Sequence, residues 1–408
     1  MRDKICFSGD MVTPHDIKNE LESKKFYGKA IREDKMIEYE GTLLIEFNEF
    51  DVANIVMKDV KVKYSSKHDL IPISPSDEYK LLSKHIGKSN LIIKEHKLIN
   101  NEMIKFTIKN VTWVNNKPPN TFPEGTKFYF CFTNLRLDFH EIRLKLNGLN
   151  LRFIEAGKDY WLQAKTSKGG KITNVAEAIL EKPMSKESLN EHIFSICVAL
   201  KILTLNRVTC PIYKFILPGG DSGYIIKGAC PHIGAIDGYR LLSIGNFNPK
   251  YVNIFVEKLL KVIHKNKYKW NLVQFSDYLV LYNNSYYIEN KIIFLILALE
   301  TLCSGFLKSK NFDINNMGLE TKIYSVINYL NQKNFFIKKK ELNKKYFMND
   351  LKRYRNNLFH EGKLPSYDLN TLSQIALEQH IAWLELSWIL ALRMLGLEYY
   401  GDIRKFTN

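Results

Sequence analysis

The sequence lacks the features that mark disulfide-rich, zinc-binding or repetitive proteins. Its six cysteines are scattered over 408 residues, and no two form a Cys-x-x-Cys pair. Cys210, Cys230 and His232 could supply three zinc ligands, but their spacing matches no standard zinc site. We therefore interpret the cysteines as ordinary buried thiols in a reducing compartment, and we expect neither a metal nor another cofactor.

Long hydrophobic runs are also missing. The most apolar run, residues 292–299, stops at Glu300 and is far too short to cross a bilayer. Charged residues stand within the first five positions and no long apolar segment follows them, so we expect no signal peptide. These two absences predict a cytoplasmic protein that does not contact a membrane.

Acidic residues are in deficit. The chain has 59 Lys and Arg against 43 Asp and Glu, which leaves a formal net charge of +16. Such an excess favours a polyanionic partner, and nucleic acid is the first candidate. The alternative explanation is the general richness in lysine, asparagine and isoleucine, which can arise from biased codon usage.

The N-terminal part has the pattern of short β-strands. Residues 39–47, 103–113 and 127–132 are rich in strand-forming residues, and Asn147-Gly148 is a favoured two-residue turn for a hairpin over residues 144–153. Turns rich in Asn, Gly and Pro separate these segments. We therefore predict an α+β protein whose N-terminal domain, residues 1–180, is a β-rich antiparallel sandwich or barrel.

The middle of the chain, residues 181–285, mixes both patterns. Residues 188–204 and 251–265 have helical spacing, and residues 211–228 resemble a hairpin that turns at residues 219–223. We interpret this stretch as a mixed α/β connecting region.

The C-terminal part is helical. Apolar residues recur at helical spacing over residues 288–307, 319–332, 346–359 and 369–395. Four helices within residues 286–408 predict an all-α four-helix bundle.

The third of these helices carries the most chemically informative motif, Arg355-Asn-Asn-Leu-Phe-His360. Arginine can hold a phosphate and histidine can transfer protons near neutral pH, so the pair could cleave RNA without a metal. In an ideal helix, side chains five positions apart differ by about 140° of rotation. The helix must therefore end or bend near Phe359, and Gly362 and Pro365 supply stop signals.

The motif lies beside an apolar stripe and within a basic stretch of the sequence. Phe347, Leu351, Tyr354 and Leu358 recur every three or four residues, which predicts the face that packs in the core. Between positions 338 and 363 the sequence has nine Lys or Arg and only three Asp or Glu. The basic residues predicted to bind RNA are Lys344, Lys345, Lys352, Arg353 and Lys363.

Arg355 and His360, with four residues between them, match the R-x4-6-H motif of HEPN domains. The upstream helical segment that contains Glu300, and the long closing helix, follow the order found in that family. With its β-rich N-terminal half, the chain most resembles the ApeA-type HEPN proteins of bacterial anti-phage defence. The motif resemblance covers residues 286–400.

This resemblance implies a metal-independent endoribonuclease that acts as a homodimer through the HEPN domain, with RNA, tRNA included, as the substrate. His360 would transfer protons and Arg355 would hold the scissile phosphate, while Asn356 would orient the histidine or the substrate. Glu300 would fix the Arg355 rotamer, and Asn357 would support the site. The products would be a 2′,3′-cyclic phosphate and a 5′-hydroxyl.

Uncontrolled RNA cleavage would be lethal, so we expect the N-terminal domain to restrain the site or to detect a phage-derived trigger in an abortive-infection response. Two alternatives stay open. One is a catalytically inactive HEPN module for dimerisation or RNA binding, in which Arg355 makes a salt bridge and His360 caps a helix end. The other is the toxin of a toxin–antitoxin pair.

Overall fold

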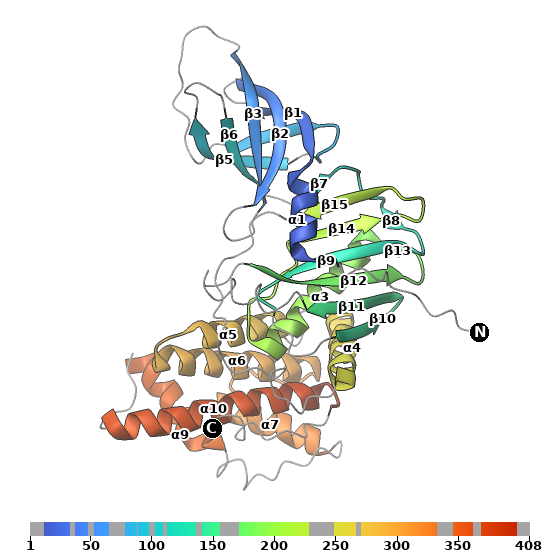
Figure 1. The fold of residues 1–408 in the computed structure, drawn as a ribbon. Helices are drawn as coiled ribbons and strands as arrows, with labels where there is room; N and C mark the ends of the chain where they lie inside the picture. Colours follow the sequence, from blue (N-terminus) through green and yellow to red (C-terminus); the bar gives the residue numbers. More distant parts are fainter. Residues whose placement is uncertain are drawn as a thin grey trace, which may run out of the picture. The chain divides into compact units, whose positions relative to one another are not determined.

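The computed structural model divides into two compact units (Figure 1). The first comprises Met1–Ile193 and Val208–Ile236, and the second comprises Phe194–Arg207 and Asp237–Asn408. We call them the β-rich unit and the helical unit. The described residues are 12–32, 37–47, 53–64, 78–87, 89–97, 103–108, 112–135, 141–155, 171–227, 249–266, 271–332, 346–361 and 369–397.

A closed antiparallel barrel forms the first part of the β-rich unit, with strand order β1-β2-β3-β6-β5-β4 (Figure 1). Inward-facing side chains such as Ala30, Leu43, Tyr79 and Phe106 are fully buried and fill its interior. Closure pairs the strand edges that an open sheet would expose. The strands are β1 (Lys25–Arg32), β2 (Ile37–Phe47), β3 (Ala53–Tyr64), β4 (Glu78–Ser83), β5 (Ser89–Lys97) and β6 (Met103–Ile108).

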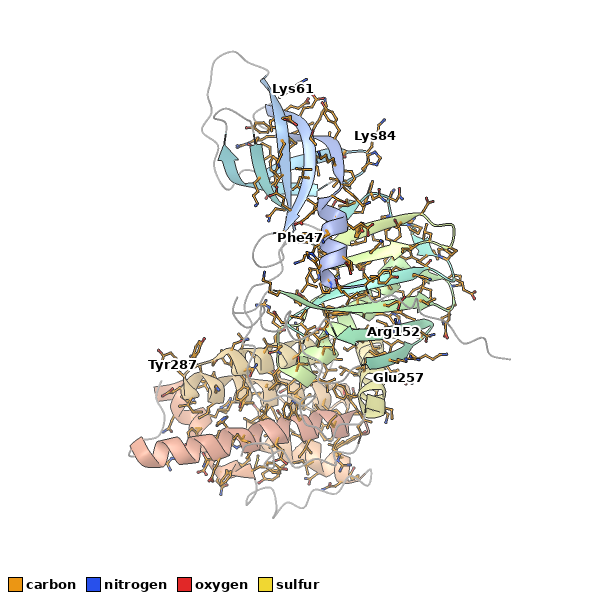
Figure 2. The ribbon with its side chains drawn as sticks, viewed as in Figure 1. Phe47, Lys61, Lys84, Arg152, Glu257 and Tyr287 are labelled. Carbon is orange, nitrogen blue, oxygen red and sulfur yellow. The ribbon has the colours of Figure 1, made fainter. Side chains whose placement is uncertain are left out.

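A seven-stranded antiparallel sheet follows, with order β10-β11-β12-β9-β14-β15-β7. Every residue of its inner strand β12 is buried, and Arg152 of β11, labelled in Figure 2, pairs with Glu177 of β12 at 2.9 Å. The strands are β7 (Thr112–Val114), β9 (Lys127–Thr133), β10 (Glu141–Leu146), β11 (Leu149–Glu155), β12 (Ile172–Leu180), β14 (Ile212–Ile216) and β15 (Ser222–Ile226); β8 (Thr121–Phe122) and β13 (Met184–Ser185) form a separate pair.

Both hairpins that the sequence predicted in this sheet are confirmed. β10 and β11 turn at Asn147-Gly148, where both residues have positive φ, as a two-residue primed turn requires. β14 and β15 form the second hairpin. Because β14 pairs with β9, residues from the expected connecting region complete the sheet of the β-rich unit.

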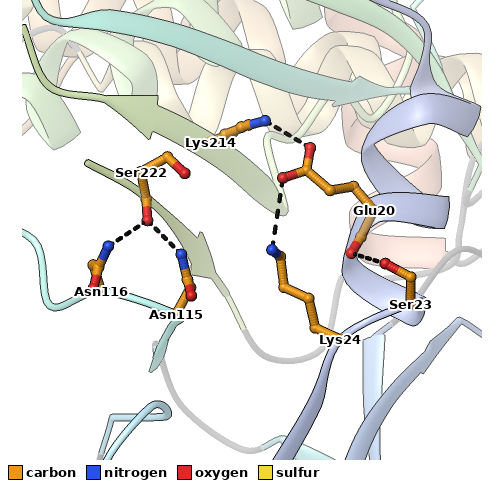
Figure 3. Close-up of polar contacts among 7 residues, drawn as sticks. All are labelled: Glu20, Ser23, Lys24, Asn115, Asn116, Lys214 and Ser222. Carbon is orange, nitrogen blue, oxygen red and sulfur yellow. Dashed lines mark hydrogen bonds and ion pairs between the residues drawn. The ribbon is translucent and has the colours of Figure 1, made fainter. Parts of the chain in front are cut away.

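Helix α1 (Pro14–Glu22) packs against this β-structure. A capping box between Thr13 and Asp16 starts the helix, and Ile17 and Leu21 are buried beneath it. In the last turn of α1, Glu20 forms an ion pair with Lys214 of β14. Lys214 Nζ lies 2.6 Å from Glu20 Oε2 (Figure 3). One apolar core and one ion pair therefore hold α1 in place.

The helical unit is built around α6, which contacts α5, α7, α9 and α10. Its apolar face is continuous, and Leu295, Leu299 and Leu302 are fully buried. The helices are the second half of α3 (Lys186–Thr204), α4 (Pro249–Asn266), α5 (Leu272–Asn284), α6 (Ile288–Ser309), α7 (Leu319–Asn331), α9 (Met348–Asn356), the π-helical turn η2 (Asn357–Glu361) and α10 (Leu369–Met394).

The prediction of a C-terminal all-α four-helix bundle is wrong. The four segments expected to form it are helical, but α4, α5 and the second half of α3 belong to the same unit. Leu272, Phe275 and Leu279 of α5 are buried, and α5 packs along α6. The fold is mixed, with large antiparallel sheets in the N-terminal and middle parts and helices mainly in the C-terminal half.

Helix α6 is also the one helix among the described residues that is long and apolar enough to cross a membrane by length and composition. The eight-residue run considered in the sequence is thus only part of a longer apolar helix. Most of that helix is buried against its neighbours, which accounts for its composition without a bilayer.

Candidate functional site

The segment that carries the predicted motif is anchored at its start. Phe347 precedes α9 with a left-handed backbone (φ 47°) and is half-buried, so Met348 occupies the core position that the spacing assigned to Phe347. Leu351, Tyr354 and Leu358 are buried, as predicted. The Tyr354 ring also packs edge-on against Trp383 of α10, with centroids 5.5 Å apart.

Two polar contacts add to this anchoring. The indole Nε1 of Trp383 donates a hydrogen bond to the Tyr346 carbonyl at 2.9 Å. Gln379 Nε2 donates to Asp350 Oδ2, also at 2.9 Å. Helix α10 therefore fixes both the entry and the first turn of α9.

The sequence predicted that the helix ends or bends near Phe359, and α9 does end close by, at Asn356. It widens into the π-helical turn η2, which runs through His360 to Glu361. A π-helix hydrogen-bonds residue i to residue i+5, so side chains five positions apart lie closer to one face than in an α-helix. Phe359 is half exposed and His360 is exposed on this turn.

Arg355 lies between an acid and an aromatic ring. Its Nε is 3.6 Å from Glu300 Oε2, and its Cζ is 5.9 Å from the centre of the Phe359 ring. The predicted pairing of Arg355 with Glu300 is therefore confirmed. The side chain is 33% exposed, so the guanidinium is oriented from two sides and still reaches solvent.

Glu300 has a second partner that sequence reasoning missed. Lys322 of α7 donates a hydrogen bond from Nζ to Glu300 Oε1 at 2.9 Å, and its side chain is only 10% exposed. A lysine is expected on the surface. The available signal was its position three residues after Leu319 and four before Val326, on the apolar face of α7.

Cys303 lies beside this pair of charges on α6. Complete burial raises the pKa of its thiol to about 12, with Lys322 and Glu300 as smaller and opposing influences. A thiol with that pKa stays protonated at neutral pH. Cys303 is therefore a packing residue rather than a nucleophile.

The remaining predicted residues are only partly assembled. Asn356 is exposed and Asn357 is half-buried, next to Arg355 in sequence. Lys352 and Arg353 are exposed on α9. Within the described part of the chain, no hydrogen bond or ring contact joins Arg355 to His360. Lys344, Lys345 and Lys363 lie outside the described residues, as do Cys230 and His232.

The site therefore combines an oriented arginine, a half-buried carboxylate paired with a buried lysine, and an exposed histidine. Such a set can bind a phosphate and exchange protons with water or substrate. In the described ranges, no group of three or more His, Cys, Asp or Glu side chains is arranged to hold a metal ion. No protein-family model, curated protein or solved structure matches this chain.

Proposed function

We propose that this protein is a metal-independent endoribonuclease of the HEPN type, with Arg355 and His360 as its catalytic residues. The observation that carries the proposal is the placement of Arg355. Glu300 and Phe359 hold it from two sides, and an exposed histidine follows on the π-helical turn. The net charge of +16 is consistent with a polyanionic substrate.

In the proposed reaction the ribose 2′-oxygen attacks the adjacent phosphorus and the bond to the 5′-oxygen breaks. A base takes the 2′-proton and an acid protonates the leaving 5′-oxygen, which yields a 2′,3′-cyclic phosphate and a 5′-hydroxyl. Arg355 stabilises the charge on the phosphoryl oxygens. DNA has no 2′-hydroxyl and cannot follow this route.

One histidine cannot be base and acid in the same step. We therefore propose a homodimer in which two copies of His360 face one another and divide these roles, with Asn356 orienting substrate. In the same proposal the β-rich unit restrains cleavage until a phage-derived trigger relieves it in the cytoplasm. Deleting residues 1–180 without changing activity or toxicity would exclude that regulatory role.

The central test replaces the proton carrier. We expect His360→Ala to lower the rate of RNA cleavage by about 10²- to 10⁴-fold, measured in EDTA with end-group analysis of the products. His15→Ala, which removes an exposed histidine of the β-rich unit, is the matched control and keeps wild-type activity. Equal cleavage by the wild type and His360→Ala would refute the assignment.

A second function is favoured by the ion pair itself. If Glu300 serves only to neutralise Arg355, the helical unit is a non-catalytic RNA-binding or dimerisation module. RNA binding without any cleavage by the wild type would select this function.

A further inference from the structure

Lys322 and Arg355 share one carboxylate unequally. Lys322 Nζ hydrogen-bonds Glu300 Oε1 at 2.9 Å, whereas Arg355 Nε lies 3.6 Å from Oε2 and makes no hydrogen bond there. The lysine side chain is 10% exposed and the arginine side chain 33%. Lys322 is thus the close, buried partner of Glu300, and Arg355 is the looser and more accessible one.

The charges of this cluster do not cancel. One carboxylate and two cations leave a net charge of +1, and Coulomb attraction favours the nearer, less solvated pair. The neighbouring thiol of Cys303 adds no charge, because its pKa is about 12. The uncompensated positive charge therefore stays mainly on Arg355, the member that solvent reaches.

We propose that Lys322 is a positioning residue of the RNA site, which holds Glu300 so that Arg355 is oriented by the carboxylate yet keeps its charge for a phosphate. The phosphate as ligand rests on the proposed function. Without Lys322, the half-buried carboxylate would turn to Arg355 as its remaining cation and compete with the phosphate.

The alternative is a purely structural role, in which the ion pair between Lys322 and Glu300 only joins α7 to α6. In that case the loss of Lys322 lowers stability but leaves phosphate binding by the folded protein unchanged. Removing the Glu300 charge would then do nothing to restore binding. The two explanations therefore differ in a double-variant experiment.

The experiment measures binding of a labelled, mixed-sequence 2′-O-methyl RNA oligonucleotide, which has no nucleophilic 2′-hydroxyl. We expect Lys322→Met to weaken binding about ten- to hundredfold. The slope of log affinity against log salt should fall by about 0.7, as for the loss of one phosphate contact on a single strand. Glu300→Gln alone should bind at least as tightly as the wild type, and Lys322→Met with Glu300→Gln should return to wild-type affinity.

Lys201→Met is the matched control, because Lys201 of α3 pairs with Asp277 of α5 at 2.8 Å in the same unit and is 14% exposed. It should leave affinity and salt slope unchanged. Thermal unfolding identifies variants that are folded. The double variant and Glu300→Gln keep the test valid if Lys322→Met does not fold, since neither leaves the half-buried carboxylate opposite a missing lysine.

Three results would overturn the proposal. The first is wild-type affinity in Lys322→Met, and the second is a folded double variant that binds as weakly as Lys322→Met. The third is a Glu300→Gln variant that binds less tightly than the wild type. A cleavage assay on the same variants tests the nuclease assignment independently of the role of Lys322. The expected binding pattern in a protein that does not cleave RNA supports the role of Lys322 and refutes the nuclease. RNA cleavage together with equal affinities in all folded variants supports the nuclease and refutes the role of Lys322.

Discussion

Each unit of the protein contains a glutamate that binds one cation closely and another loosely. In the β-rich unit, Glu20 lies 2.6 Å from Lys214 and 3.8 Å from Lys24 (Figure 3). In the helical unit, Glu300 lies 2.9 Å from Lys322 and 3.6 Å from Arg355. The two clusters have the same sign of charge and nearly the same spacing.

Their surroundings differ. Lys24 lies just after the C-terminal end of α1, the helix that carries Glu20, and Lys214 lies over the buried Tyr224 ring, 5.7 Å from its centre. Burial and the nearby Glu20 carboxylate raise the pKa of Tyr224, so its hydroxyl stays neutral. The Glu20 cluster therefore docks a helix onto a sheet, and its described members Glu20, Lys24, Lys214 and Tyr224 include no histidine.

The loose cation of the Glu300 cluster comes from a separate helix, lies against the half-exposed Phe359 and precedes an exposed histidine. A carboxylate between two cations is therefore not by itself a sign of function. What surrounds the looser cation separates a structural cluster from a candidate site.

We expect the largest difference in RNA cleavage between the two clusters when the loosely bound cation is removed from each. Arg355→Ala should lower RNA cleavage by about 10²- to 10³-fold, because it removes the group proposed to stabilise the transition-state charge. Lys24→Ala, the matched change in the β-rich unit, should leave cleavage unchanged. A similar loss of cleavage in both variants would mean that the Glu300 cluster has no special role.

Neutralising the carboxylate in each cluster should have a smaller effect. Glu300→Gln removes the charge that orients Arg355, and we expect kcat to fall by up to about 10²-fold while KM does not rise. Glu20→Gln should leave cleavage intact and lower the free energy of unfolding by about 1 kcal/mol, because the carboxylate is partly exposed. Steady-state kinetics and denaturant unfolding of both variants measure these outcomes.

The smallest expected effect is on the pH dependence of stability. Burial raises the pKa of Glu20, but hydrogen bonds from Lys214 and Tyr224 outweigh it and place the pKa below its usual 4.5. A lowered folded-state pKa adds stability above the unfolded-state value, and this is lost as pH falls through the folded-state value. The wild type should therefore lose its advantage over Glu20→Gln below about pH 4.5. A constant difference down to pH 2 would contradict this.

Residues that repeat with a regular period were the easiest to place from sequence. The Asn147-Gly148 turn follows from local backbone preference, and the buried positions Leu351, Tyr354 and Leu358 follow from helical spacing. The pairing of Glu300 with Arg355 was expected from the family resemblance and is present. Each of these depends on neighbours in sequence or on a known motif.

Features that depend on distant contacts were missed. Phe347 fits the helical period, yet its left-handed backbone places it before the first turn of α9, and Met348 takes its core position. Lys322 is buried, and its partner Glu300 lies on another helix, far from it in sequence. The membership of α5 in the helical unit likewise depends on its packing along α6. Local composition does not reveal such distant partners. The four-helix bundle was predicted from helical periodicity, which does not show which helices pack together.

The π-helical turn has a consequence for how this segment can change in evolution. Such a turn holds one residue more than an α-helical turn of the same height. Loss of one residue between Arg355 and His360 could relax η2 to an α-helix without breaking the apolar packing of α9. The histidine would then follow Arg355 by four positions, a spacing that places two side chains on the same face of an α-helix. A single-residue deletion would therefore test the spacing of these two residues separately from their identity.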